Sequence, residues 1–154
     1  MAAANDTLPT HELSVSRFIA APPMHVYRTW TERLTEFFTP PPWTVPHVAL
    51  DLRPGGRFDV TMRGPDGTEQ VHSGVFLEVV PGERLVSTDA FAPGWLPRPA
   101  FLVSITTFAP EGNGTRYIAT ARHWNAEACA QHAAMGFTTG WGTVADQLAT
   151  LAEA

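Results

Sequence analysis

Apolar and polar residues alternate with a period of two through the middle of the chain, which is the pattern of half-buried β-strands. The alternation extends from about residue 45 to residue 123 and is interrupted by turn-forming segments, among them Gly64-Pro65-Asp66-Gly67 and Pro81-Gly82. An Asp-Gly pair supplies the positive φ angles that a tight hairpin requires. The pattern therefore predicts a meander of six antiparallel strands, and a weaker alternation predicts a further strand over residues 12–20.

Apolar residues recur at helical spacing on both sides of this meander. Ala21-Pro22-Pro23 predicts a helix start, because proline is favoured in a first turn. Pro40-Pro41-Pro42 ends helical structure, so one or two short helices are expected between these segments. Near the C-terminus, Asn125 is a suitable N-cap for one long helix. The apolar face of that helix consists of Ala130, Ala133, Ala134, Phe137, Trp141, Val144, Ala145, Leu148 and Leu151.

Two glycines, Gly136 and Gly140, fall within this predicted helix. Each costs up to about 1 kcal/mol relative to alanine, so they indicate a helix that approaches another element closely or leaves space beside it. Packing of the helix on the sheet alone is the alternative. His132 falls roughly opposite Trp141 on the same helix, and we expect His132 to be exposed to solvent.

A meander with one apolar face needs a cover, and the C-terminal helix is the only predicted element long enough to provide it. We therefore expect an α+β fold in which a curved antiparallel sheet of about seven strands wraps around this helix. Residues 12–154 are expected to form a single domain, preceded by a flexible tail over residues 1–11.

Small residues on the inner face of this sheet predict a cavity beneath the helix. Ala119 and Ala121 share that face with the bulky Phe101, and the helix glycines add further space. Aromatic residues on proline-bounded segments are expected at the cavity mouth. The predicted ligand-binding residues are Phe37, Phe38, Trp43, Phe58, Val60, Met62, Val75, Trp95, Phe101, Val103, Ala119, Ala121, His123, Phe137 and Trp141. A dry, fully packed core is the alternative.

Among the polar residues predicted to face inward, His123 is the best candidate for a chemical role, because a histidine can act as acid, base or hydrogen-bond donor. Tyr117 adds a hydroxyl to the same face. The alternative is an ordinary, partly exposed histidine at a strand end. The sequence contains no Gly-x-Ser-x-Gly elbow, phosphate loop or dinucleotide fingerprint, and its histidines show no paired metal spacing, so no metal or cofactor is expected.

The composition narrows the functional classes further. Of the residues, 44% are hydrophobic and 16% are charged, which is typical of a soluble globular protein. A formal net charge of −5 argues against nucleic-acid binding, and the absence of lysine excludes Schiff-base chemistry. Cys129 is the only cysteine, so no internal disulfide can form. Without an apolar run of about 18 residues or a secretory signal, we expect no membrane insertion and a cytoplasmic location.

A series of short segments also occurs in a characteristic order along the chain. It comprises Ala21-Pro22 with Val26 and Trp30-Thr31, Asp51-Leu52-Arg53-Pro54-Gly55-Gly56-Arg57-Phe58, Asp66-Gly67, Gly74-Val75-Phe76-Leu77-Glu78-Val79-Val80-Pro81, Glu83-Arg84-Leu85-Val86, Gly114-Thr115-Arg116, and Gly140-Trp141 with Leu148. This series, spread over residues 12–152, resembles the activator-of-Hsp90-ATPase homologue-like branch of the START/birch-pollen-allergen superfamily, also called SRPBCC. The resemblance implies a helix-grip fold with a deep cavity between the sheet and the C-terminal helix.

The resemblance does not imply one activity, since its relatives include lipid and hormone binders, polyketide aromatases and cyclases, and co-chaperone domains. The leading hypothesis is binding of a small hydrophobic or aromatic molecule. The second is a cyclase, dehydratase or hydrolase that uses His123 and Tyr117, and the third is a co-chaperone-like interaction module, with a homodimer left open. Eukaryotic co-chaperones carry an extra N-terminal domain that binds the chaperone, and only a short segment precedes the first strand here, so Hsp90 is not expected as a partner.

Overall fold

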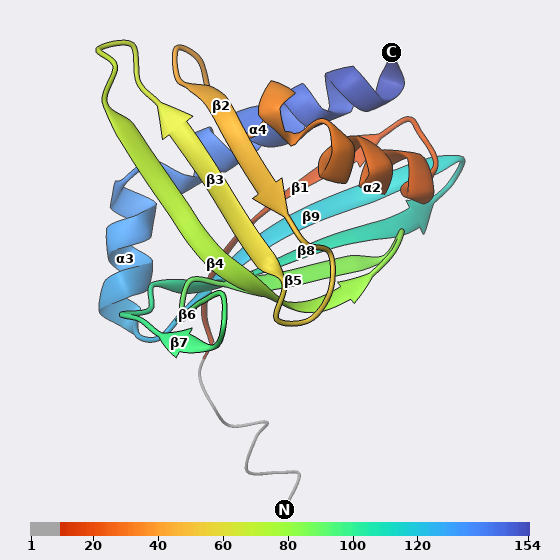
Figure 1. The fold of residues 1–154 in the computed structure, drawn as a ribbon. Coiled ribbons are helices and arrows are strands. Elements are labelled where there is room, and N and C mark those ends of the chain that lie inside the picture. The colour runs from red at the N-terminus through yellow and green to blue at the C-terminus, as the bar shows by residue number, and fades with distance from the viewer. Residues whose placement is uncertain (1–9) are drawn as a thin grey trace, which may run out of the picture.

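The computed structural model describes residues 10–154, so most of the predicted tail lies outside the described residues (Figure 1). The strands are β1 His11–Ile19, β2 Thr44–Leu50, β3 Arg57–Arg63, β4 Glu69–Val80, β5 Arg84–Thr88, β6 Phe91–Ala92, β7 Leu96–Pro97, β8 Leu102–Glu111 and β9 Gly114–His123. The helices are α2 Pro23–Glu32, the short 3₁₀ helix η1 Leu34–Glu36, α3 Ala126–Ala134 and α4 Phe137–Glu153. β1 already begins at His11, within the segment predicted as tail.

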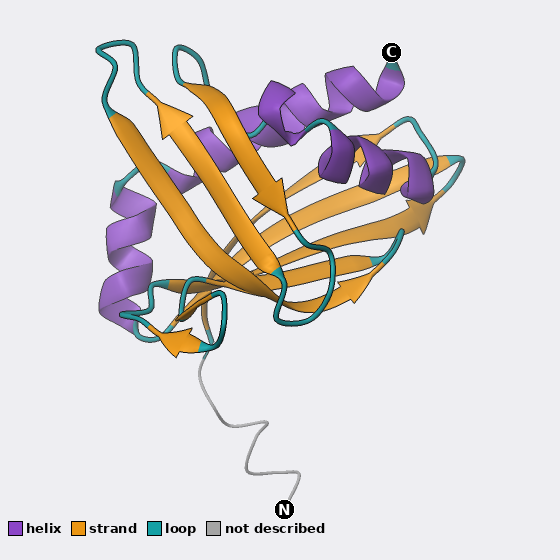
Figure 2. Ribbon diagram, viewed as in Figure 1, coloured by secondary structure: helices purple, strands orange, loops and turns teal. Residues whose placement is uncertain are grey.

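Seven of the strands form one antiparallel sheet in the order β1-β9-β8-β5-β4-β3-β2. The predicted six-stranded meander is therefore confirmed, with β1 added at the edge beside β9. β6 and β7 form a separate two-stranded hairpin in the region predicted to be a loop. The α+β helix-grip architecture is confirmed, because the sheet curls around α4, which packs on β1 and against α2 (Figure 2).

The C-terminal helical region differs from the prediction of one long helix. Asn125 caps α3 as expected, since its side-chain oxygen accepts a hydrogen bond from the backbone N–H of Ala128 at 2.8 Å. The helix then ends, because Gly136 adopts a left-handed conformation with φ 91°, which only glycine adopts at little cost. α4 starts in a new direction, and Figure 1 shows α3 set steeply against it.

The core lies between α4, α2 and the inner face of the sheet. Its largest fully buried side chains include those of Phe37, Phe76, Phe108, Ile19, Leu34 and Leu148. Aromatic rings dominate one side of this core: Phe58 stacks on Phe76 with a centroid separation of 5.0 Å and packs edge-on against Trp30 at 5.9 Å. Aromatic pairs in these arrangements add to the free energy gained from burial.

The inner faces of two strands differ from those predicted by alternation. Phe58 faces inward as expected and lies opposite Gly74 in the β3–β4 register, so His72 and Gly74 face inward and Val75 faces outward. On β8, Leu102 lies opposite the inward-facing His123, which places Val103 on the outer face. The prediction that Val75 and Val103 face the cavity is therefore wrong.

At Val75 the error arises because the outer face of β4 is also covered at this end of the sheet. The β6–β7 hairpin packs against β4, and the Arg98 guanidinium donates a hydrogen bond to the Ser73 carbonyl at 3.2 Å. Val75 is fully buried although it points away from α4. A bulge between Phe76 and Glu78 in β4 shifts the alternation further.

Candidate functional site

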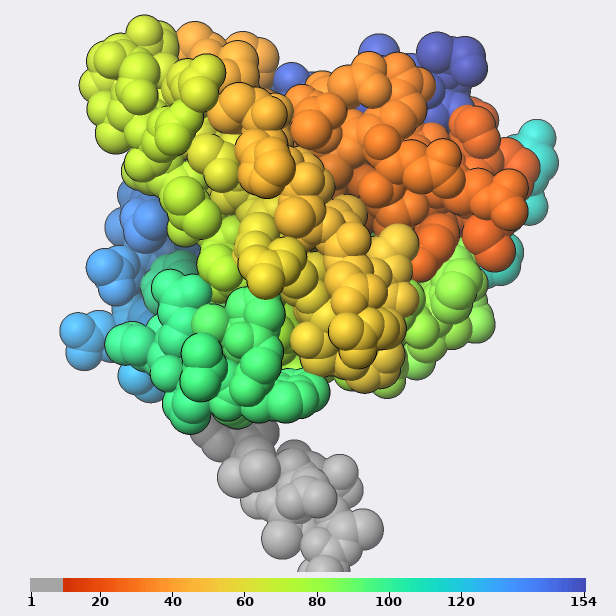
Figure 3. Space-filling model, in the orientation of Figure 1, coloured from red at the N-terminus to blue at the C-terminus, as the bar shows by residue number. Residues whose placement is uncertain are grey.

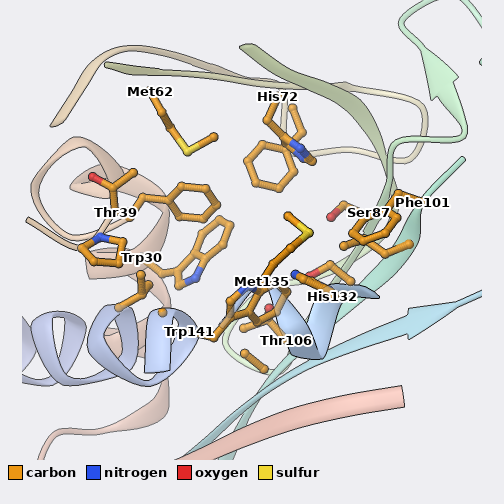
Figure 4. A pocket seen from close by; sticks show the side chains of 18 of the residues that line it. Trp30, Thr39, Met62, His72, Ser87, Phe101, Thr106, His132, Met135 and Trp141 are labelled. Atoms are coloured by element: carbon orange, nitrogen blue, oxygen red, sulfur yellow. The ribbon is translucent and has the colours of Figure 1, made fainter. Parts of the chain in front are cut away.

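A cavity of about 390 Å³ lies between the inner face of the sheet and the two C-terminal helices. Figure 4 shows most of its lining side chains, and Figure 3 shows that residues of β2, β3 and β4, coloured orange to yellow-green, form a continuous outer face of the molecule. Met135 lines the cavity although it is 69% exposed, so it marks the side that opens to solvent.

Aromatic side chains from distant parts of the chain form the apolar walls of this cavity. They are Trp30 of α2, Phe38, Phe58 of β3, Phe101 and Trp141 of α4. Trp30, Phe38 and Phe58 pack on one another edge to face, with centroid separations of 5.9 to 6.2 Å. This mutual packing holds the rings in place, so the aromatic wall is preformed.

Phe101 precedes β8 and is positioned by a carboxylate rather than by the sheet. The Asp89 side chain accepts hydrogen bonds from the backbone N–H groups of Phe101, at 2.9 Å, and of Leu102, at 3.2 Å. The Thr88 hydroxyl donates to the Leu102 carbonyl at 3.0 Å. These bonds fix the entry into β8 and direct the Phe101 ring toward the cavity.

The polar lining is uncharged. It consists of hydroxyls and two imidazoles, from Thr39, His72, Ser87, Ser104, Thr106, Tyr117 and His132, and no Asp, Glu, Lys or Arg is among the described residues that line the cavity. Ser87 lies directly opposite Ser104 in the β5–β8 register, and Thr106 is the next inward residue of β8. One wall therefore carries a short row of hydroxyls.

His132 and His123 form a buried hydrogen-bonded pair at the end of this wall. The His123 Nε2 atom lies 2.8 Å from His132 Nδ1, and the His123 Nδ1 atom lies 2.9 Å from the His11 carbonyl oxygen. His132 is only 8% exposed, which contradicts the predicted exposure. The break at Gly136 turns α3 so that His132 faces the sheet instead of solvent.

Burial shifts the pKa values of several groups around the cavity. Desolvation lowers the pKa of His132, and the neighbouring His123 lowers it further. The pKa of His72, on the opposite wall, is lowered by desolvation, which outweighs the raising effects of Asp89 and Asp59. Burial raises the pKa of Tyr117 to about 12, with Trp30 acting weakly in the opposite sense. The imidazoles of His72 and His132 therefore favour their neutral forms.

The sequence matches the family model of activator of Hsp90 ATPase homolog 1-like proteins over residues 20–153. The chain belongs to this family. No curated protein sequence matches it. None of the helices in the described part of the chain is long and apolar enough to cross a membrane.

Solved structures of bacterial proteins share the fold of this family member. Protein NE0264 from Nitrosomonas europaea is 37% identical, with a TM-score of 0.87 over 91% of this chain and 92% of that chain. Protein Ms6760 from Mycobacterium smegmatis is 26% identical, with a TM-score of 0.77 over 92% and 90% of the two chains. A protein from Arthrobacter aurescens is 20% identical, with a TM-score of 0.78 over 92% and 85%, and this last likeness concerns the fold alone.

Twelve of the fifteen predicted ligand-binding residues of this family member occupy four kinds of position. Phe38, Phe58, Met62, Phe101, Ala119 and Trp141 line the cavity, as does Tyr117. Phe37 and Trp43 line a second, smaller depression of about 300 Å³ near η1. Val60, Ala121 and Phe137 are buried in the surrounding core. His123 lies behind His132.

The remaining three predicted residues lie elsewhere. Val103 and Val75 are on the outer face of the sheet, for the reason given above. Trp95 lies in the turn between β6 and β7, is 55% exposed, and packs edge-on against Phe91 at 5.6 Å. Its proline-bounded segment therefore forms a hairpin on the outside of the sheet and not the mouth of this cavity.

Apart from Tyr117, sequence reasoning missed the polar residues that line the cavity. His72 belongs to a strand whose apolar residues suggested the opposite face, and Ser87, Ser104 and Thr106 fall at positions that alternation assigned outward or left open. For His132 the pattern predicts exposure to solvent, because one continuous helix would place it opposite Trp141. Gly136 was the one available signal, since glycine is strongly enriched just past a helix end.

Proposed function

We propose that this protein binds a small, uncharged, mainly aromatic or hydrophobic molecule in the cavity between the sheet, α3 and α4. The observation that carries the proposal is a cavity of about 390 Å³ with preformed aromatic walls and no charged lining residue. Ligand pockets are commonly about 300–1,000 Å³ in volume and mainly apolar, with a few placed polar groups. A charged ligand would lose its hydration without gaining an ionic partner.

Binding is preferred over the catalytic roles considered for His123 and Tyr117. Both ring nitrogens of His123 are engaged, one by the His11 carbonyl and the other by His132. Tyr117 is a weak acid because burial raises its pKa to about 12. Neither group is positioned to exchange a proton with a ligand near neutral pH. The cytoplasmic location stays a prediction from the sequence, and a homodimer stays open.

A cavity-filling variant tests the proposal with the neutral dye N-phenyl-1-naphthylamine, whose fluorescence rises in apolar sites. Gly140 lines the cavity, and a Cβ built on it meets no atom within 4 Å. Gly140→Leu therefore has an unobstructed Cβ position and also improves helix propensity. We expect it to weaken dye binding at least about tenfold, which corresponds to roughly 1.4 kcal/mol, with the fold intact.

Gly142→Leu is the matched control. Gly142 is also in α4 and has an equally free Cβ position, but it does not line the cavity. We expect this variant to bind the dye like the wild type. Saturating dye, at about 100 times its Kd, should stabilise the wild type by about 2.7 kcal/mol. A folded wild-type protein that shows no saturable dye binding and no thermal stabilisation would overturn the proposal.

A further inference from the structure

The hydrogen bonds of the histidine pair determine which ring nitrogen faces the cavity. A carbonyl oxygen can only accept, so His123 Nδ1 must carry the hydrogen that is donated to the His11 carbonyl. In a neutral ring the other nitrogen is then an acceptor, so His123 Nε2 accepts from His132 Nδ1–H. His132 Nε2 is consequently left with a free lone pair.

Aromatic rings surround His132 and restrict where this lone pair can point. The rings of Phe101 and Phe137 lie 5.0 Å from the imidazole, centroid to centroid, and that of Trp141 lies 5.8 Å away. No described residue forms a hydrogen bond with His132 Nε2. No fully enclosed side-chain nitrogen or oxygen in the described residues lacks a partner, so His132 Nε2 is not fully enclosed, and the His132 ring is one of the side chains that line the cavity (Figure 4).

We propose that the His132–His123 pair makes the cavity selective for neutral aromatic ligands that carry a phenol-type hydroxyl, with His132 Nε2 accepting the hydrogen bond from that hydroxyl. This inference rests on the proposed function, since it specifies the ligand class of the same cavity. His123 is a positioning residue: together with the His11 carbonyl it fixes the tautomer of His132.

The chemistry of the site favours this class over other polar ligands. A carboxylate or phosphate offers no hydrogen to a lone pair and meets no Lys or Arg among the lining residues. An ammonium group would lose hydration with no carboxylate beside it. An aromatic ligand without a donor fits the walls but leaves His132 Nε2 dehydrated and unpaired, which weakens binding. A phenol satisfies both the aromatic wall and the acceptor.

Three related probes test the selectivity: naphthalene, 2-naphthol and 2-methoxynaphthalene. The last keeps the oxygen of 2-naphthol but cannot donate. Binding of 2-methoxynaphthalene leaves one buried acceptor unpaired. We therefore expect wild-type protein to bind 2-naphthol at least about ten times more tightly than 2-methoxynaphthalene. Displacement of N-phenyl-1-naphthylamine measures both affinities. His132→Phe removes the acceptor but keeps a ring, and it should abolish this ratio while naphthalene still binds.

His72→Phe is the matched control, because His72 is the other imidazole that lines the cavity. This variant should change the affinities for both oxygen-containing probes together and keep their ratio.

Nitrogen-15 NMR of wild-type protein gives a readout that needs no variant: the His132 Nε2 resonance should shift upfield with 2-naphthol and stay in place with 2-methoxynaphthalene. In His123→Phe, His132 should show a mixture of tautomers and lose the preference.

The outcomes separate this inference from the proposed function. Equal affinities for 2-naphthol and 2-methoxynaphthalene in wild-type protein, or a preference that survives in His132→Phe, would overturn the selectivity and leave cavity binding standing. An unchanged His132 Nε2 resonance in the presence of bound 2-naphthol would overturn it as well. If neither the dye nor any naphthalene probe binds, the proposed function fails, and the selectivity fails with it.

Discussion

Trp141 joins the C-terminal helix to the cavity through a small set of aromatic contacts. Its ring lies 4.5 Å from Phe137 and 5.8 Å from His132, centroid to centroid, and it is only partly buried. Phe76, by contrast, is fully buried and stacks on Phe58. Truncating each of these two residues therefore compares how much a cavity-wall side chain and a packed core side chain contribute to the stability of the fold.

We expect Phe76→Ala to lower the free energy of unfolding by about 3–5 kcal/mol, as is typical of a large buried aromatic residue. Trp141→Ala should cost less than the lower end of that range, because the side chain is partly solvated and already borders empty space. It should nevertheless weaken binding of N-phenyl-1-naphthylamine. Urea denaturation and dye titration measure the two effects. Equal losses of stability would mean that Trp141 is a core residue and not a cavity wall.

At the scale of elements, Gly136 divides the C-terminal segment into two helices, α3 and α4, that run in different directions. Its N–H donates to the Ala133 carbonyl at 3.1 Å and closes α3, while its own carbonyl accepts from Gly140 N–H at 2.9 Å in the first turn of α4. The left-handed conformation between these bonds sets the direction of α3 and thereby brings His132 to His123. Without this break, His132 would stay on the solvent side of a continuous helix.

Two alanine substitutions in this region should have opposite effects. Gly136→Ala forces a residue with a Cβ into φ 91°, and we expect a loss of about 1–2 kcal/mol. The Cβ itself meets no atom within 4 Å, so the loss reflects backbone conformation alone. Gly142→Ala, inside α4 and equally free of contacts, should gain up to about 1 kcal/mol. Chemical denaturation measures both, and a gain in both variants would contradict the break at Gly136.

The whole molecule should lose stability in mildly acidic solution because two cavity histidines are held neutral. Burial lowers the pKa of His72 and of His132 below the ordinary value of 6.5. As the pH falls through this value, the unfolded chain gains protons that the folded protein does not take up. The unfolded state therefore becomes relatively more favourable between about pH 7 and the lowered folded-state pKa values.

We expect the free energy of unfolding to fall from pH 7.5 to pH 5.5 and the double variant His72→Gln/His132→Gln to show a shallower slope. The carboxyl groups of Glu36, Asp66 and Glu111 act in a separate range, since their pKa values are lowered from 4.5, 3.8 and 4.5 and their contribution disappears only at more acidic pH. Urea denaturation at several pH values gives the slopes. An unchanged slope in the double variant would show that other groups control the acid response.

The sequence by itself determined the features that depend on neighbouring residues. Strand periodicity, the Asp66-Gly67 turn and the Asn125 cap are all encoded within a few positions, and each is present: Gly67 has φ 87° and Asn125 caps α3. The inward faces of β3 and β9 were also predictable from alternation. On β3 the alternate positions carry Phe58, Val60 and Met62, and on β9 they carry Tyr117, Ala119 and Ala121. These local signals were sufficient for the helix-grip fold.

Only the tertiary structure decided which polar groups face the cavity. On β4 both sides of the sheet are covered near the β6–β7 hairpin, so alternation no longer distinguishes inside from outside there, and Val75 is buried on the outer face. His123 and His132 are paired because a left-handed glycine redirects α3 toward β9. Both outcomes depend on how distant elements pack against one another, and local periodicity carries no information about that packing.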